Sequence, residues 1–180
     1  MDDVVIIGGG IIGVATAYFL SKEGRKVKVI EKDPSYKEAS FPLSLGGFRR
    51  QFFQKENILL GKFARDFIFQ IPELLKTKKN PNPTASMVPN GYLLMFGPEH
   101  AEEQYRALEN HKECGAGTKN IKGSELSKVF SYINDEGIET ATYTDDKSEG
   151  WIDPFMFHSA LNSKATELGA EFIKGEVKEI

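Results

Sequence analysis

The chain has 180 residues, of which 40% are hydrophobic and 27% charged, with a formal net charge of −3 and a single cysteine. A chain of this length can bury a substantial core in one domain and begin a second. The small net charge argues against a nucleic-acid partner or a surface for anionic lipid, and the lone Cys114 excludes an intramolecular disulfide.

The chain begins with an apolar run over 4–7 that predicts a buried strand, and a second apolar stretch predicts a helix over 11–23 that stops at Gly24. This region does not fit a signal peptide, because Asp2 and Asp3 stand where such a segment is basic. It is also short for a bilayer span. We therefore expect no transmembrane segment and no presequence in this chain.

The turn between this strand and this helix is rich in glycine. Gly8 allows a tight turn, Gly10 lets the backbone approach a pyrophosphate without an intervening Cβ, and Gly13 allows the helix to pack closely on the strand. Phosphates would then meet the helix N-terminus, where amides without an intrahelical partner and the helix dipole favour negative charge. This arrangement predicts a dinucleotide-binding turn.

A second strand is predicted over 27–30, and it ends in Glu31. This acid follows Gly13 at about the 20-residue separation at which an acid binds the ribose of a dinucleotide. Its carboxylate can accept two hydrogen bonds from a ribose diol and would repel a 2′-phosphate, which argues against NADP. The alternatives are an ordinary glycine turn and a solvated charge at a strand end. The strand, the spacing and the acid together favour the dinucleotide site.

The middle of the chain is expected to hold one long amphipathic helix over 56–75, which ends around Pro72 and has its aromatic side chains in the core. The polar stretch 76–83 contains two Asn-Pro pairs and is a candidate crossing between domains. A buried strand is predicted over 91–96, and a helix is predicted to start at Pro98.

The last third of the chain predicts a short helix over 123–130 and a strand over 138–144. A further helix should start with Asp153 as its N-cap and Pro154 in its first turn. Two strands are expected to close the chain, over 170–173 and 176–180. Because the last strand has no following element, the fold is expected to be incomplete at its carboxyl end.

The sequence contains no set of residues typical of hydrolytic or metal chemistry. His100, His111 and His158 have no carboxylate or cysteine at metal-ligand spacing, so we expect all three to be structural or exposed. We expect no metal site and no Ser/His/Asp set.

Four segments resemble the D-amino-acid-oxidase-like FAD-dependent oxidoreductases, a group that includes sarcosine and glycine oxidases. They are the first strand and glycine turn with 29–32, the stretch 39–52, the strand 90–94 and the segment 149–154. The Ser-x-Gly-Gly-x-Arg and Gly-Trp-x-Asp-Pro patterns point to this group. The opening turn alone would also fit an NAD-dependent dehydrogenase, but that hypothesis explains neither later pattern.

The resemblance implies an α/β fold in which a Rossmann-type FAD-binding domain carries an inserted, incomplete α+β substrate-binding layer. The FAD-binding domain would comprise residues 1–83 and 150–180, and the substrate-binding layer residues 84–149. The resemblance further implies that FAD is the cofactor and that the substrate is a small molecule.

The resemblance also assigns residues to the two halves of FAD. Residues beside the flavin and its ribityl chain would be Ser40, Ser44, Gly46 and Gly47. Arg49 would lie near the flavin, where a guanidinium could stabilise anionic reduced flavin or hold a substrate carboxylate. Arg50 is the weaker candidate, and the alternative for both is a surface arginine pair. The ADP half would be held by Gly8, Gly9, Gly10, Ile11, Ile12, Gly13, Glu31 and Lys32, with Val177 beside the adenine in a strand.

The leading hypothesis is therefore a fragment or short isoform of a flavoprotein oxidoreductase, which in its full-length form oxidises an amine or amino-acid-like substrate by hydride transfer to FAD. Whether this chain alone is an enzyme stays open, because the segment that closes over the flavin in the group is not in the sequence. Within the group the chain also resembles members associated with the assembly of mitochondrial respiratory complex I. An assembly factor that keeps the FAD fold is the alternative, with complex I assembly intermediates as partners. By this resemblance the protein would be located in mitochondria. Without it, we would expect a cytoplasmic protein.

Overall fold

The computed structural model describes residues 4–179, and the contacts among its residues divide the chain into two units. Unit 1 comprises the residues up to 46, 68–87 and those from 152, and unit 2 comprises 47–67 and 88–151. The sequence predicted that residues 47–67 belong to the amino-terminal domain. In the structure, these residues make most of their contacts within unit 2. The assignment of FAD to one part and substrate to the other remains a prediction.

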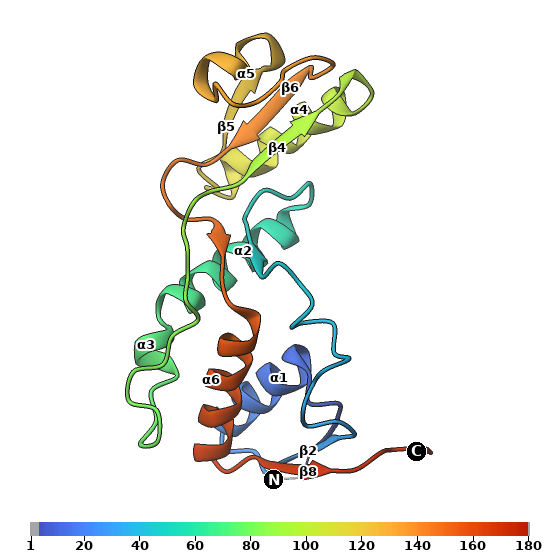
Figure 1. Ribbon diagram of the computed structural model, residues 1–180, viewed down its shortest axis with the longest axis vertical. Helices are drawn as coiled ribbons and strands as arrows, with labels where there is room; N and C mark the ends of the chain where they lie inside the picture. The colour runs from blue at the N-terminus through green and yellow to red at the C-terminus, as the bar shows by residue number, and fades with distance from the viewer. Residues whose placement is uncertain (1–3, 180) are drawn as a thin grey trace. The chain divides into compact units, whose positions relative to one another are not determined.

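Unit 1 is built on a parallel three-stranded sheet in the order β1-β2-β8. Its strands are β1 (Val4–Ile7), β2 (Val27–Glu31) and β8 (Glu171–Lys174). Helices α1 (Ile11–Lys22) and α6 (Pro154–Glu167) lie together on one face of this sheet (Figure 1). This is the strand–helix–strand unit that the apolar runs and the glycine turn predicted.

Helices α1 and α6 begin where the sequence predicted, and α1 ends before the predicted stop at Gly24. Gly24 has φ +75° just after α1, a conformation that glycine adopts at little cost. The side chain of Asp153 accepts a hydrogen bond from Met156 N at 2.8 Å, and Pro154 is the first residue of α6. An N-cap carboxylate and a proline without N–H together fix the start of this helix.

The opposite face of the parallel sheet is largely open within residues 4–179. Val5 and Ile7 of β1 are 57% and 55% exposed, and Ile173 of β8 is 43% exposed. Val27 and Val29 in β2, which pair with Val4 and Ile6, are buried on the other face of the sheet. Alternate residues of a strand point to opposite faces, so one covered face explains this pattern.

The long helix expected over 56–75 is instead two helices, and the single-helix prediction is wrong. Helix α2 (Lys55–Phe69) ends before Gln70, and the short α3 (Ile71–Leu74) follows with Pro72 in its first turn. Proline lacks the N–H that would continue the first helix and clashes with the carbonyl four residues earlier. Pro72 therefore starts a new helix instead of ending the old one.

The expected burial of the aromatic side chains on α2 is also wrong. Ile58 and Ile68 are buried, but Phe63 is 55% exposed, and Leu59 and Leu60 are 54% and 64% exposed. The apolar residues of this helix therefore lie on more than one of its faces, and only one face packs against the core.

Unit 2 contains an antiparallel sheet in the order β4-β6-β5. Its strands are β4 (Leu93–Phe96), β5 (Lys119–Lys122) and β6 (Thr140–Tyr143), and its helices, besides most of α2, are α4 (Pro98–Glu113) and α5 (Gly123–Val129). The sequence did not predict β5, because this edge strand has two lysines and an asparagine among its four residues. The short pair β3 (Gly47–Phe48) and β7 (Gly150–Trp151) was not predicted either.

Two other expectations differ from the structure. Residues 175–179 form no strand, so the predicted strand over 176–180 is wrong for its described residues, and Ile180 lies outside them. Residues 76–83, the expected crossing, remain in unit 1, where Lys78 N donates to the side chain of Glu167 at 2.8 Å. The chain instead passes to unit 2 after Met87. Within residues 4–179, every helix is too short or too polar to cross a lipid bilayer.

Candidate functional site

The glycine turn of unit 1 has the backbone that its spacing predicted. Gly8 adopts φ +93°, and Gly10 is the N-cap of α1 in an extended conformation. A Cβ on Gly13 would lie 1.9 Å from the carbonyl oxygen of Gly8, so any side chain there would force the helix away from the turn. A Cβ on Gly10 would meet no atom within 4 Å. One glycine is thus required by packing, and the other borders open space.

Glu31 lies directly against this turn. Its Oε2 accepts a hydrogen bond from Gly9 N at 2.7 Å, and its Oε1 accepts one from Asp33 N at 2.8 Å. The end of β2 and the glycine turn are therefore joined through one half-buried carboxylate. Each oxygen of a carboxylate can accept a second hydrogen bond, so a ribose diol could still bind there.

His158 on α6 contacts the same turn. The sequence predicted only that this histidine is structural or exposed, and it did not predict the contact with the turn. The residue is buried, and its Nε2 donates to the carbonyl of Gly9 at 2.7 Å. Its ring stacks on Phe41 with centroids 4.4 Å apart, and the ring of Tyr36 packs edge-on at the same distance. Burial lowers the pKa of His158, although the Gly9 hydrogen bond and the charge of Glu31 act in the opposite direction.

The contact of His158 with Gly9 has a consequence for the next amide. In a trans peptide the carbonyl and the following N–H point in opposite directions. The Gly9 carbonyl faces His158 on α6, so the N–H of Gly10 faces away from His158. With the first amides of α1 alongside, these residues fit the pyrophosphate of FAD.

The other unit 1 residues named from the resemblance are less constrained. Lys32 and Ser40 are exposed, and Val177 is half-buried in an irregular segment, so the strand expected around Val177 is wrong. The hydroxyl of Ser44 donates to Phe41 O at 2.7 Å. Gly46 has φ +63°, and a Cβ there would lie 2.1 Å from Ile152 O. These positions leave the cofactor roles of the five residues as predictions.

Gly47 and Arg49 belong to unit 2. A Cβ on Gly47 would lie 1.7 Å from the hydroxyl of Tyr92, so a side chain there would have to displace the Tyr92 ring. The Arg49 guanidinium lies over the ring of Phe52, with 4.8 Å from its central carbon to the ring centroid. The described residues offer it no hydrogen-bond or ion-pair partner. Arg49 is therefore available to a ligand.

Arg50 has the opposite environment. It is buried, and its guanidinium forms an ion pair with Asp146 at 2.9 Å and donates to the hydroxyl of Ser148. Burial alone would raise the pKa of Asp146, but hydrogen bonds from Ser148 and Arg50 hold it below its ordinary value. The structure gives Arg50 a structural role and excludes the surface pair considered from the sequence.

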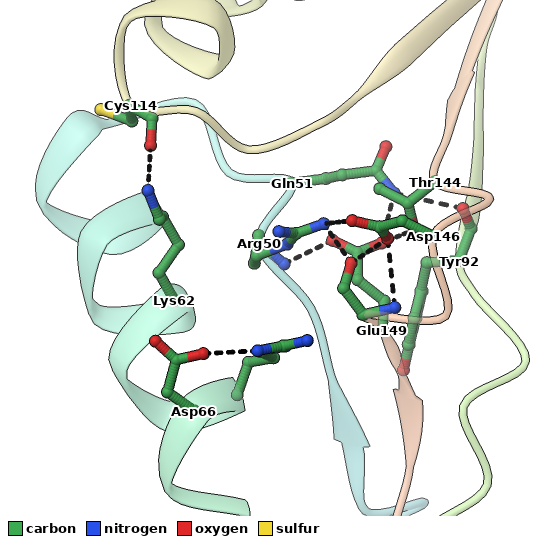
Figure 2. Close-up of polar contacts among 11 residues, drawn as sticks. Arg50, Gln51, Lys62, Asp66, Tyr92, Cys114, Thr144, Asp146 and Glu149 are labelled. Atoms are coloured by element: carbon green, nitrogen blue, oxygen red, sulfur yellow. Dashed lines mark hydrogen bonds and ion pairs between the residues drawn. The ribbon is translucent and has the colours of Figure 1, made fainter. Parts of the chain in front are cut away.

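Glu149 lies at the centre of this cluster (Figure 2). Its side chain is completely buried. Its carboxylate accepts from Arg50 N at 2.5 Å, from the Gln51 amide at 2.8 Å and from the Thr144 hydroxyl at 2.9 Å. Sequence reasoning missed this role, because the only signal was the position of Glu149 in a segment shared with the family. A buried carboxylate with three donors holds the segment 50–51, which directly follows Arg49.

A cavity of about 320 Å³ lies beside the segment 49–53 within unit 2. Its polar lining consists of Arg49, Gln51, Gln104 and His111, and β4 supplies much of the apolar lining. His111 is buried, as expected of a structural histidine, while His100 is exposed. In residues 4–179, no group of three His, Cys, Asp or Glu is placed to bind a metal ion.

Comparisons with known proteins agree with these features. A family model described as FAD dependent oxidoreductase matches residues 3–180. The chain is 36% identical over 181 residues to FAD-dependent oxidoreductase domain-containing protein 1 of Bos taurus, covering 98% of this chain and 37% of the relative. The protein of the same name in Xenopus laevis is 39% identical over 183 residues, with 97% and 36% covered. The chain thus spans little more than a third of these relatives.

Solved structures extend the comparison. L-Proline dehydrogenase from P. horikoshii is similar with a TM-score of 0.78 and 28% identity, over 96% of this chain and 44% of that chain. Glycine oxidase from Geobacillus kaustophilus has a TM-score of 0.74 and 20% identity, over 96% and 46%. The second likeness shows a shared fold alone.

Proposed function

The chain belongs to the family of FAD-dependent oxidoreductases, and on this premise we propose that it forms part of a flavoprotein that oxidises an amine or an amino-acid-like compound by hydride transfer to FAD. The glycine turn with Glu31 bonded to Gly9 is the observation that carries the proposal, since it presents an acid and free helix amides to one dinucleotide. The similarity to an L-proline dehydrogenase supports an amine or amino-acid-like substrate.

Each part of the chain would have its own task. The first amides of α1 and the N–H of Gly10 would hold the pyrophosphate, and Glu31 would accept hydrogen bonds from the ribose. His158 would fix the orientation of the Gly9 peptide. FAD, when bound, supplies the hydride acceptor. Arg49 would hold a substrate carboxylate or stabilise negative charge, because its guanidinium stacks on Phe52 and has no hydrogen-bond or ion-pair partner among the described residues.

Binding of FAD can be tested at Gly10 with two matched substitutions. Gly10→Asn and Gly10→Asp add side chains of the same shape, but only aspartate adds a charge that repels phosphate. Both can cap α1, so the fold should be retained. We expect Gly10→Asp to lower FAD affinity at least about tenfold more than Gly10→Asn. Quenching of flavin fluorescence measures both affinities, and equal affinities would contradict the proposed site.

Substrate oxidation can be tested separately. The longest natural form of the protein, loaded with FAD, should be reduced by secondary amines or imino acids such as L-proline under anaerobic conditions. Loss of the flavin absorbance band near 450 nm reports this reduction directly, with about a tenfold or greater rate loss expected for Arg49→Met. A loaded protein that no member of an amine panel reduces would refute the oxidase activity without affecting the FAD site.

The alternative is a factor for assembly of respiratory complex I in mitochondria. The exposed apolar residues Leu59, Leu60 and Phe63 of α2 favour a protein partner over water at this helix. Cells that lack the protein should then contain less assembled complex I. Gly10→Asp should restore that level if assembly needs only the fold, whereas Leu60→Glu together with Phe63→Glu should not. Normal complex I in the deleted cells would remove this role.

A further inference from the structure

Unit 2 contains a second hollow, an open pocket with aromatic walls and a volume of about 560 Å³. Its walls come from the segment before β4, the segment after α5 and the end of β6 (Figure 1). Among the described residues, this pocket and the cavity beside the segment 49–53 share only Leu93 in their linings. The pocket is therefore separately lined, and we call it the aromatic pocket.

Three aromatic rings of the aromatic pocket contact one another. The Phe130 ring meets the Tyr143 ring at 88°, with centroids 5.3 Å apart. The same Phe130 ring meets the Tyr132 ring at 76°, with centroids 6.3 Å apart. Rings set nearly at right angles to a common neighbour present faces as well as edges to the space that they border. The negative faces of such rings attract a cation placed within about 6 Å of their centroids.

These three rings are accessible to a ligand. Tyr132 is 80% exposed, and Phe130 and Tyr143 are half-buried. A single exposed ring needs no explanation, whereas an exposed ring that extends the wall of a pocket indicates a binding surface. Tyr92 also lines the pocket, but the Arg49 guanidinium carbon already lies 6.0 Å from the centroid of its ring. The binding surface therefore consists of the other three rings.

The charges at the aromatic pocket narrow the kind of cation that fits. Within the described part of the chain, Asp145 is the one charged residue of the lining, and its half-exposed carboxylate forms an ion pair with Lys119. The pocket therefore offers no free carboxylate to a primary ammonium, which is strongly hydrated and needs acceptors for three N–H groups. A fully alkylated ammonium needs no such acceptors, because its charge is carried by alkyl groups that contact ring faces.

We propose that the aromatic pocket binds a quaternary ammonium group. The rings of Phe130, Tyr132 and Tyr143 contact the alkyl groups around the nitrogen, and Asp145 adds negative charge to the lining. A free quaternary ammonium compound and a trimethylated lysine side chain share this chemistry. The quaternary nitrogen has no lone pair, so it cannot become the imine that hydride transfer from an amine produces. The ligand is therefore distinct from the substrate of the proposed oxidoreductase.

The test is titration calorimetry with the full chain and probes that differ in one feature. Choline carries the quaternary ammonium, 3,3-dimethylbutan-1-ol has the same shape with carbon in place of nitrogen, and ethanolamine carries a primary ammonium. We expect choline to bind at least about tenfold more tightly than either of the other two. The amide of N-acetyl-trimethyllysine is the fourth probe. Tighter binding of this probe than of choline identifies a modified polypeptide as the source, and weaker binding identifies a free cation.

Substitutions of an exposed tyrosine test the contribution of the rings. Tyr132→Leu removes one ring and should lower choline affinity about fivefold or more, whereas Tyr132→Phe keeps the ring and should bind choline within about twofold of the unsubstituted chain. Both variants should fold, because this side chain is largely in water. Tyr105→Leu is the matched control, since Tyr105 is 42% exposed on α4 and does not line the pocket. It should leave choline affinity unchanged.

Equal affinities for choline and 3,3-dimethylbutan-1-ol would overturn the proposal, as would the absence of binding by both choline and the trimethyllysine probe. An equal effect of Tyr132→Leu and Tyr105→Leu would also overturn it. None of these measurements needs FAD, so their outcome is distinct from that of the proposed function. Choline binding without flavin reduction would refute the oxidase and keep the aromatic pocket, whereas flavin reduction without binding of either quaternary probe would do the reverse.

Discussion

In unit 1, the groups expected to face the cofactor are backbone amides of a single short turn, whereas in unit 2 the cavity is lined by side chains from well-separated stretches. The first site depends on glycines that keep space free or allow close packing, such as Gly10 and Gly13. The second depends on a buried carboxylate, Glu149, that binds Arg50 N and the Gln51 side chain next to Arg49. Both regions rely on a buried histidine bonded to a carbonyl, His158 in one and His111 in the other.

This difference teaches how each site can fail. A site made of backbone is lost when a side chain enters it, even if the fold is retained. A site made of side chains is lost when its supporting network is broken, and stability then falls with it. The two units should therefore respond differently to small substitutions.

The largest effect is expected at Glu149. Removal of its carboxylate by Glu149→Ala leaves the buried Arg50 N–H and one of the two N–H groups of the Gln51 amide without an acceptor, while the other amide N–H keeps Tyr92 O. We expect a loss of about 4 kcal/mol in the free energy of unfolding. Urea unfolding measures it, with the exposed Glu103→Ala on α4 as control. A loss no larger than that of the control would mean that unit 2 does not depend on its network.

The next effect separates two glycines of one turn. Gly13→Ala places a Cβ 1.9 Å from Gly8 O and should cost about 3 kcal/mol in unfolding free energy, since backbone must move. Gly10→Ala meets open space and should change stability by less than about 0.5 kcal/mol. Similar unfolding midpoints for the two variants would contradict the conclusion that Gly13 is required for close packing and that Gly10 borders open space.

A smaller effect concerns Glu31, which should act on the cofactor more than on the fold. Glu31→Gln keeps the size of the side chain but removes its charge and one of its acceptor oxygens. FAD affinity should fall about tenfold, measured by flavin fluorescence titration. The exposed Glu23→Gln at the end of α1 should bind FAD unchanged. An unchanged affinity in Glu31→Gln would remove the ribose contact from the proposed site.

The smallest effect is a pH dependence that both units share. The pKa values of His158 and His111 lie below their ordinary value of 6.5 in the folded chain, mainly because of burial. The unfolded chain therefore takes up protons first as pH falls below about 6.5, and stability falls with it. Above about pH 6.5 this loss is absent. Thermal unfolding between about pH 8 and about pH 5.5 should show a smaller decline for His158→Gln than for the unsubstituted chain, and His100→Gln should change nothing.

The sequence by itself determined the glycine turn, the acid at the end of β2 and the capped start of α6. Each of these rests on residues close together in the chain, so their spacing and their backbone preferences predict them. The break between α2 and α3, the polar edge strand β5 and the missing last strand were not predictable in this way, because packing partners decide them.

Only the tertiary structure decided which side chains meet over long separations. It placed Glu149 under Arg50 and Gln51, set His158 against Gly9, and distinguished the free Arg49 from the buried Arg50. The physical reason is that a hydrogen bond across about a hundred residues depends on how elements pack, and neither residue carries a local signal of its partner.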